Sequence, residues 1–155
     1  MSRRQTLFDA ILARFKAITV SGGYETNLGR HVFAWRNTAD QPFTVAELAI
    51  GAINVRDPQS QTTQGDPSII SKHHHTLTLV IEGAVQLGAE AATVRKMIAD
   101  LTKAIGVDRK WSAIAYETNP GEDQILVAAN GITITGFTYT FTVEFRTANF
   151  DPYTT

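Results

Sequence analysis

The sequence contains no cysteine among its 155 residues and only five prolines. Without cysteine the chain cannot form a disulfide scaffold, a thiolate metal site or a cysteine nucleophile. It also lacks any apolar run near the roughly 18 residues that a membrane-spanning helix needs. Two arginines follow Met1 and Ser2, but Asp9, Arg14 and Lys16 interrupt the apolar residues after them. We therefore expect a soluble protein with no export signal and no membrane partner.

The chain carries almost no net charge. Its 14 basic and 15 acidic side chains leave −1, which disfavours a protein that coats nucleic acid through phosphate contacts. The two signs are nevertheless separated. Residues 1–36 carry six basic and two acidic side chains, whereas residues 112–155 carry one and five. A basic start and an acidic end could attract each other within one chain or between copies, and unrelated solvated faces explain the pattern equally well.

Two segments have the apolar periodicity of amphipathic helices. Residues 3–17 form the first, and Ser2 followed by Gln5 fits a capping box at its start. Residues 89–105 form the second, with Gly106 placed for a left-handed position just after the helix. Their apolar stripes recur every three or four residues; they are Leu7, Ile11, Phe15 and Ile18 in the first helix, and Val94, Ile98, Leu101 and Ile105 in the second.

Alternation and β-branched or aromatic content predict strands in four main places: residues 31–36, 50–56, 75–86 and 132–146. In the last, the apolar parity changes near Gly136, which indicates a β-bulge or a bend, and Asn130-Gly131 is a hairpin signal before it. A shorter pair, 114–118 and 124–128, is predicted around the turn Asn119-Pro120-Gly121, and residues 43–48 are ambiguous. We predict one α+β domain over residues 1–155, with a mostly antiparallel β-sheet and two amphipathic helices packed on one face.

Residues 57–72 differ from the rest of the chain in composition. They include two Asp-Pro pairs and three glutamines, and almost no apolar residue precedes Ile69. This pattern predicts a long polar loop. Because such loops are uncommon inside a compact domain and often functional, we expect this one to contact partners or other subunits, together with Arg3 and Arg4.

The run His73-His74-His75 is the most conspicuous candidate for chemistry. Neighbours on a strand point to opposite faces, so only His73 and His75 can share a side. A zinc site would need a third ligand, for which His31 or Asp66 are available, but the spacing matches no known metal motif. The simpler interpretation is that the histidines form the polar beginning of a strand, which could be a subunit contact that responds to mild acid.

The common enzyme motifs are absent. The sequence has no phosphate-binding loop of the lysine-containing kind, no Gly-x-Ser-x-Gly elbow and no nucleophile beside a plausible base. The adjacent acids Glu122 and Asp123 fit a solvated turn better than a pair of catalytic carboxylates. We predict no catalytic, cofactor-binding or metal-binding residue, and therefore no enzyme.

The order of several elements resembles the tail terminator, or minor tail protein, family of lambda-like long-tailed bacteriophages. The resemblance extends over nearly the whole chain and rests on an opening amphipathic helix, a Tyr-x-Thr-x-x-Gly element, a strand ending in Ile-Glu-Gly, and a long aromatic strand before a terminal Asp-Pro-Tyr. In this sequence these pieces are Ala10–Phe15, Tyr24–Gly29, Leu77–Gly83, Phe141–Thr147 and Asp151–Tyr153. The histidine run and the length of segment 57–72 depart from the family pattern.

The resemblance implies a structural protein of virion assembly, encoded by a phage or prophage. Such a protein assembles in the host cytoplasm and resides in the virion tail. It forms a homo-oligomer, a six-membered ring that caps the tail tube protein, ends tube polymerisation and presents the surface for the head-completion (connector) protein. DNA passes through the ring without specific binding.

Two alternatives to a tail terminator remain open at this stage. One is another neck or baseplate component of the tail, and the other is a small ligand-binding or enzymatic domain with its site between the second helix and the sheet. For the assembly protein we predict interface residues on the polar segment, at both termini and in the histidine run: Arg3, Arg4, Asp57, Gln61, Asp66, His73, His75 and Tyr153.

Overall fold

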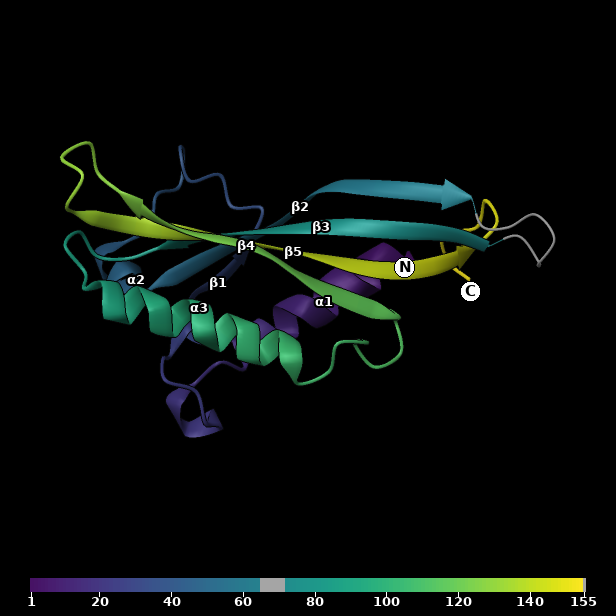
Figure 1. Ribbon diagram of the computed structural model, residues 1–155, viewed down its shortest axis with the longest axis horizontal. Helices are drawn as coiled ribbons and strands as arrows, with labels where there is room; N and C mark the ends of the chain where they lie inside the picture. Colours follow the sequence, from purple (N-terminus) through teal and green to yellow (C-terminus); the bar gives the residue numbers. More distant parts are fainter. Residues whose placement is uncertain (65–71, 155) are drawn as a thin grey trace.

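The computed structural model describes residues 1–64 and 72–154. Its centre is one five-stranded sheet with the strand order β1-β2-β3-β5-β4. All neighbouring strands are antiparallel except β1 and β2, which are parallel. The two longer helices lie on the same side of the sheet (Figure 1), which confirms the predicted α+β fold. No helix in the described ranges is long and apolar enough to span a membrane.

Helix α1 spans Arg3–Lys16 and matches its prediction closely. The Ser2 hydroxyl caps it by accepting the N–H of Gln5, while the Gln5 side chain bonds Asp9 instead of completing a capping box. The predicted stripe is entirely buried, because Leu7, Ile11, Phe15 and Ile18 have no exposed surface. Two short 3₁₀ turns, η1 (Val20–Gly22) and η2 (Leu28–His31), then lead into β1.

Helix α3 spans Ala91–Gly106 and covers the β4–β5 side of the sheet, whereas α1 covers the β1 side. Val94 and Leu101 are fully buried, as the stripe predicts. The prediction for Gly106 was wrong, since this glycine is the last helical residue and Val107 follows it in a right-handed conformation. The ambiguous segment 43–48 contains the start of a short helix, α2 (Val45–Ile50), which a complete capping box between Thr44 and Glu47 fixes.

The polar segment after residue 56 is a strand for much of its length, which corrects the predicted loop. Strand β2 spans Ala52–Gln64 and β3 spans Lys72–Ala84, and the two pair from Ala52↔Ala84 to Gln64↔His73. The register shifts between Arg56 and Gln59, so Asp57 and Pro58 form a bulge. A bulge tolerates proline, and the polar side chains beyond it project from an exposed part of the sheet. Residues 59–64 therefore form nearly half of β2 and are not a loop.

A second correction concerns residues 114–128. They do not form two strands around a turn, because β4 is a single strand, Glu117–Val127, paired with β5. The register shifts between Pro120 and Asp123, so Gly121 and Glu122 form a bulge, while Asn119 and Pro120 pair with β5. Since β4 is an edge strand, Pro120 removes no hydrogen bond from a second neighbour.

Strand β5 spans Ile134–Ala148 and pairs with β3 over 13 residue pairs, from Lys72↔Ala148 to Ala84↔Gly136. The predicted irregularity at Gly136 is present, because Leu126 pairs with Gly136 while Val127 pairs with Ile134. The buried residues of β3 and β5 face the helices and form much of the sheet side of the core: Leu77, Leu79, Ile81, Phe137, Tyr139, Phe141, Val143 and Phe145. Strand β1 is only Val32–Ala34.

Candidate functional site

The sheet has two chemically different ends and one face without a long helix (Figure 1). Both termini lie at one end, where the Arg3 backbone N–H donates to the Pro152 carbonyl at 2.9 Å. We call this the terminal end and define it by His73, His75, Phe150 and Tyr153. The opposite end holds the β4–β5 connection and the β3–α3 loop, and we call it the aliphatic end, defined by Leu87, Val127 and Ile132.

At the terminal end His73 and His75 share the helix-facing side, as predicted, with ring centroids 6.2 Å apart. Both nitrogens of His75 are occupied. Nδ1 lies 2.9 Å from the Thr62 hydroxyl and Nε2 lies 2.8 Å from the Thr147 hydroxyl. The ring also stacks on Phe145 at 4.8 Å. Burial lowers the pKa of His75, and the neighbouring His73 and His74 lower it further. His75 thus links β2 and β5 through hydrogen bonds to both strands.

His74 lies on the other side of the sheet, beside Tyr116 and Arg146. Its Nδ1 lies 3.3 Å from the Tyr116 hydroxyl, and the Arg146 guanidinium lies 4.7 Å from the centre of the same tyrosine ring. Burial raises the pKa of Tyr116, and the nearby Glu144 carboxylate raises it further. The three consecutive histidines therefore serve two separate contacts and do not converge on one point.

Arg4 and Asp57, both predicted at an interface, bind each other within the chain. Arg4 Nε donates to Asp57 Oδ2 at 2.7 Å, and its terminal nitrogen donates to the Asp57 carbonyl at 2.6 Å. Asp57 Oδ1 accepts the indole N–H of Trp35 at 2.8 Å. Trp35 remains 52% exposed and has a left-handed φ of 52°, which is costly for a non-glycine residue. Sequence reasoning missed Trp35, which appeared only as a strand aromatic.

Arg3 is also engaged within the chain, because its guanidinium donates to the carbonyls of Ala113 and Ile114, each at 3.1 Å. These carbonyls belong to a turn in which Trp111, Ser112 and Ala113 all have φ between 51° and 65°. Asp108 braces the turn by accepting backbone N–H groups of Ser112 and Lys110. The same two N–H groups lower the pKa of Asp108. Arg3 thus fixes α1 to the α3–β4 connection.

The remaining predicted interface residues divide into two kinds. Gln61 and Tyr153 are exposed, and Tyr153 shows 66% of its surface. Asp66 lies outside the described residues. Within 1–64 and 72–154 no group of three or more histidine or carboxylate side chains is arranged to hold a metal ion.

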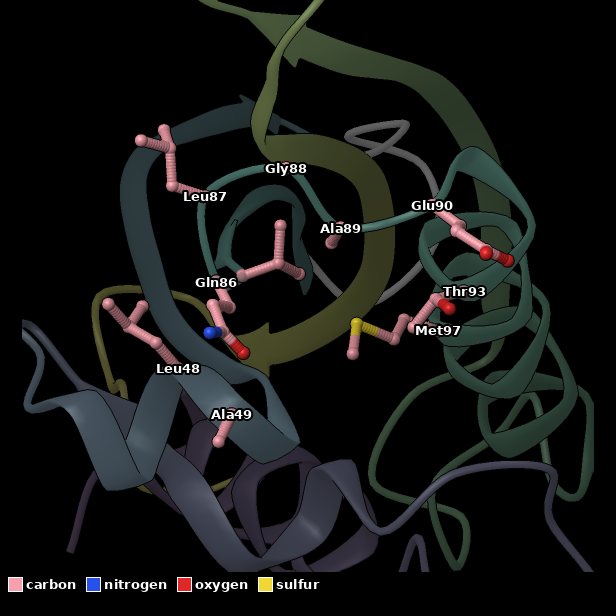
Figure 2. Close-up of a pocket in the computed structure, with 10 residues that line it drawn as sticks. Leu48, Ala49, Gln86, Leu87, Gly88, Ala89, Glu90, Thr93 and Met97 are labelled. Carbon is pink, nitrogen blue, oxygen red and sulfur yellow. The ribbon is translucent and has the colours of Figure 1, made fainter.

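A hollow of about 390 Å³ lies at the aliphatic end, between α2, the β3–α3 loop and the start of α3 (Figure 2). This is where the sequence would place a ligand site between the second helix and the sheet. Met97 points into it from α3, whereas the Glu90 carboxylate points away from its centre. Glu90 is the one ionisable side chain among the described residues that line the hollow. The lining offers apolar contact but no pair of groups for acid–base chemistry.

The sheet face opposite the helices is rich in threonine. Five of its half-buried side chains are hydroxyls on the two central strands: Thr76, Thr78, Thr138, Thr140 and Thr142. Two of its carboxylates have partners, because Glu82 forms an ion pair with Arg56 and Glu144 accepts a hydrogen bond from the neutral Asn119 side chain at 3.1 Å. We call this surface the threonine face.

Comparison of the chain with family models and with curated proteins found no match.

Proposed function

We propose that this protein is a structural component of a phage tail that caps the tail tube as a ring, ends its polymerisation and provides the head-joining surface. The proposal combines the family resemblance of the sequence with the arrangement of the sheet. The threonine face is the observation that carries it, because a broad surface rich in hydroxyl groups suits a wall past which DNA slides.

The electrostatics of the threonine face support this role. A protein that grips DNA presents unpaired lysine or arginine side chains to phosphates, and each such contact strengthens binding. On this face Arg56 pairs with Glu82, and Arg146 lies over the ring of Tyr116. Threonine hydroxyls keep the surface wet without adding charge. Such a wall would let DNA move with little retention.

The two ends of the sheet support a ring whose two rims meet different partners. The aliphatic end exposes Leu87 by 71% and Ile132 by 84%, and the terminal end exposes Phe150 by 88%. Large apolar side chains exposed at both ends are typical of protein contacts. Copies related by rotation alone would place all aliphatic ends on one rim and all terminal ends on the other. One rim would then face the tube protein and the other the connector protein.

Two experiments test the proposed function. Light scattering of the purified protein should give about six times the 17.0 kDa of one chain, most clearly at high concentration. Electron microscopy of particles produced without this protein should show overlong tubes or tails lacking heads. Tails of normal length that lack a different attached structure would favour a neck or baseplate component instead. Normal particles that attach heads would reject a role in tail completion.

A ligand-binding role is the second candidate, and the hollow at the aliphatic end favours it. Its volume lies within the range of small-molecule sites, and Gln86, Glu90 and Thr93 are polar side chains in its lining. Replacing Met97 by tryptophan would fill the hollow from α3. If tail assembly survives this filling while a bound small molecule is lost, the hollow is a ligand site; if assembly alone changes, the aliphatic end acts as a protein contact.

A further inference from the structure

Half of β2 has an open edge. Strand β1 pairs with β2 only at Ile53, Asn54 and Val55, and the chain then turns away at Trp35. Beyond the bulge, Gln59–Gln64 pairs with β3 on one side, and no described segment pairs with it on the other. The segment is exposed except for the half-buried Ser60. Backbone N–H and C=O groups along this edge are therefore available to another strand.

The other sheet edges among the described residues are protected against such pairing. Strand β4 carries Pro120, a bulge, and the acidic pair Glu122 and Asp123, all of which hinder edge-to-edge contact. The end of β5 is covered by the C-terminal turn, where the Ala148 N–H donates to the Thr154 carbonyl at 2.9 Å. Strand β1 is protected by its length of three residues.

Within its six residues the open edge has none of these protections, and the Asp57–Pro58 bulge directly precedes it. Its sequence, Gln-Ser-Gln-Thr-Thr-Gln, contains no charge, no proline and no glycine over six residues. Trp35 and Arg4 both bind Asp57 at the point where β1 ends, so an added strand would begin to pair with β2 beyond this contact. A bare edge of this length would be a hazard for a monomer, because an exposed strand recruits other chains.

We propose that Gln59–Gln64 is a dimer contact, which pairs antiparallel with the same segment of a second copy across a two-fold axis. A second copy is the occupant. Among the described edges only Gln59–Gln64 is unprotected, so the edge of a second copy that can accept it is the same segment. An uncharged strand opposite itself creates no like-charge repulsion, and glutamine and threonine can hydrogen-bond across the pair. The contact is isologous, so each bond made by one copy is made again by the other.

The register of the pairing is restricted by the side-chain faces. In a continuous sheet, directly opposed residues point to the same side. Gln59, Gln61 and Thr63 share the threonine face, whereas Ser60, Thr62 and Gln64 share the helix side. The two-fold axis must therefore lie between a residue and the same residue of the second copy, because any other register would oppose side chains from different faces. The central pair is Gln61 with Gln61 of the second copy, or Thr62 with Thr62 of the second copy.

The absence of native cysteine makes the contact directly testable, because any disulfide between single-cysteine variants joins two copies. Directly opposed strand residues have the Cα separation that a disulfide accepts. Under mild oxidation of dilute protein, we expect one of Gln61→Cys and Thr62→Cys to convert mostly to a disulfide dimer, and the other to remain largely monomeric on a non-reducing gel. Glu122→Cys on the β4 edge is the matched control, and it should remain monomeric.

A charged variant tests the same contact without a cross-link. Thr62→Lys in the Gln61→Cys variant, or Gln61→Lys in the Thr62→Cys variant, should remove most of the dimer, because two lysines would lie near the axis. The unfolding midpoint should stay near that of the parent variant, since positions 61 and 62 are both exposed. The proposal is overturned if neither edge cysteine cross-links, if Glu122→Cys cross-links equally well, or if the lysine leaves dimer formation unchanged. A two-fold axis relates copies that point in opposite directions, so this contact joins two rings or two free chains, and not neighbours within a ring whose copies all point the same way. Its failure therefore leaves the proposed ring untouched.

Discussion

Two glycines, Gly83 and Gly106, should respond in opposite directions to the same substitution. Gly83 lies in β3 and pairs directly with Phe137 of β5. A Cβ added at Gly83 would overlap the aromatic ring of Phe137, which is fully buried and enclosed by the core. Gly106 ends α3, has no positive φ, and a Cβ there would meet no atom within 4 Å.

The magnitudes follow from these surroundings. Overpacking a dense core typically costs about 1–3 kcal/mol, and the Phe137 ring is fully buried. Gly83→Ala should therefore lower the free energy of unfolding by about that amount. Gly106→Ala should raise it by about 0.5–1 kcal/mol, because alanine restricts the unfolded chain and favours the helix. In a chain of this size each kcal/mol moves the melting temperature by about 2–4 °C.

Urea unfolding followed by circular dichroism measures both changes, provided that the m-value stays constant. The double variant Gly83→Ala with Phe137→Leu isolates the cause, because a smaller side chain at 137 should recover part of the loss at 83. The reasoning is refuted if Gly83→Ala is as stable as the natural protein. It is equally refuted if Phe137→Leu and Gly83→Ala destabilise additively, since the clash between them would then be absent.

Two further predictions concern Asp100 and His75. Asp100 is buried and accepts the N–H groups of Glu25 and Thr26, at 3.1 and 2.8 Å, and the Thr26 hydroxyl at 2.7 Å. Asp100→Ala should cost at least about 2 kcal/mol in urea unfolding, because it leaves these donors without an acceptor, and a loss below about 0.5 kcal/mol would contradict this. The lowered pKa of His75 means that the unfolded chain binds its proton more readily than the folded chain. Stability should therefore fall as the pH drops through about 6.5, and His75→Gln should show a shallower fall between about pH 7.5 and 5.5. Equal slopes for the two proteins would remove His75 as the cause.

The helices could be predicted from the sequence because local pattern and packing agree there. The stripe of α1 is apolar at every position that the core requires, and Ser2 marks its start. The short helix α2 also carries a readable signal, since Thr44 and Glu47 have the spacing of a capping box. Its short length and apolar content nevertheless left helix and strand equally plausible.

The errors occurred where strands lie at exposed edges. Asp57 and Pro58 have the composition of a turn, yet they occupy a bulge in β2. Asn119-Pro120-Gly121 also suggests a turn, but an edge strand accepts proline and glycine without loss of core pairing. In both cases the pairing partner lies elsewhere in the chain, so local residue preference could not indicate it.

The candidate site was predictable only in part. The alternation of a strand placed His73 and His75 on one side, and the structure confirms this. Nothing local indicated that Arg4 and Asp57 bind each other, since 53 positions separate them. Trp35 carried no signal at all, because its exposure and left-handed backbone depend on where β1 leaves the sheet.

The long β3–β5 ladder has a consequence for how the chain folds. Strands β2 and β3 form one hairpin and β4 and β5 form another, each closed by a connection that is short in sequence. The ladder joins these hairpins across α3, and at the terminal end it brings together His75 and Thr147, which lie 72 positions apart. Closing so distant a contact costs more chain entropy than closing either hairpin. Folding speed should therefore depend on the joining of two preformed halves, so that a circular permutant opened between β3 and α3 would change the rate far more than the stability.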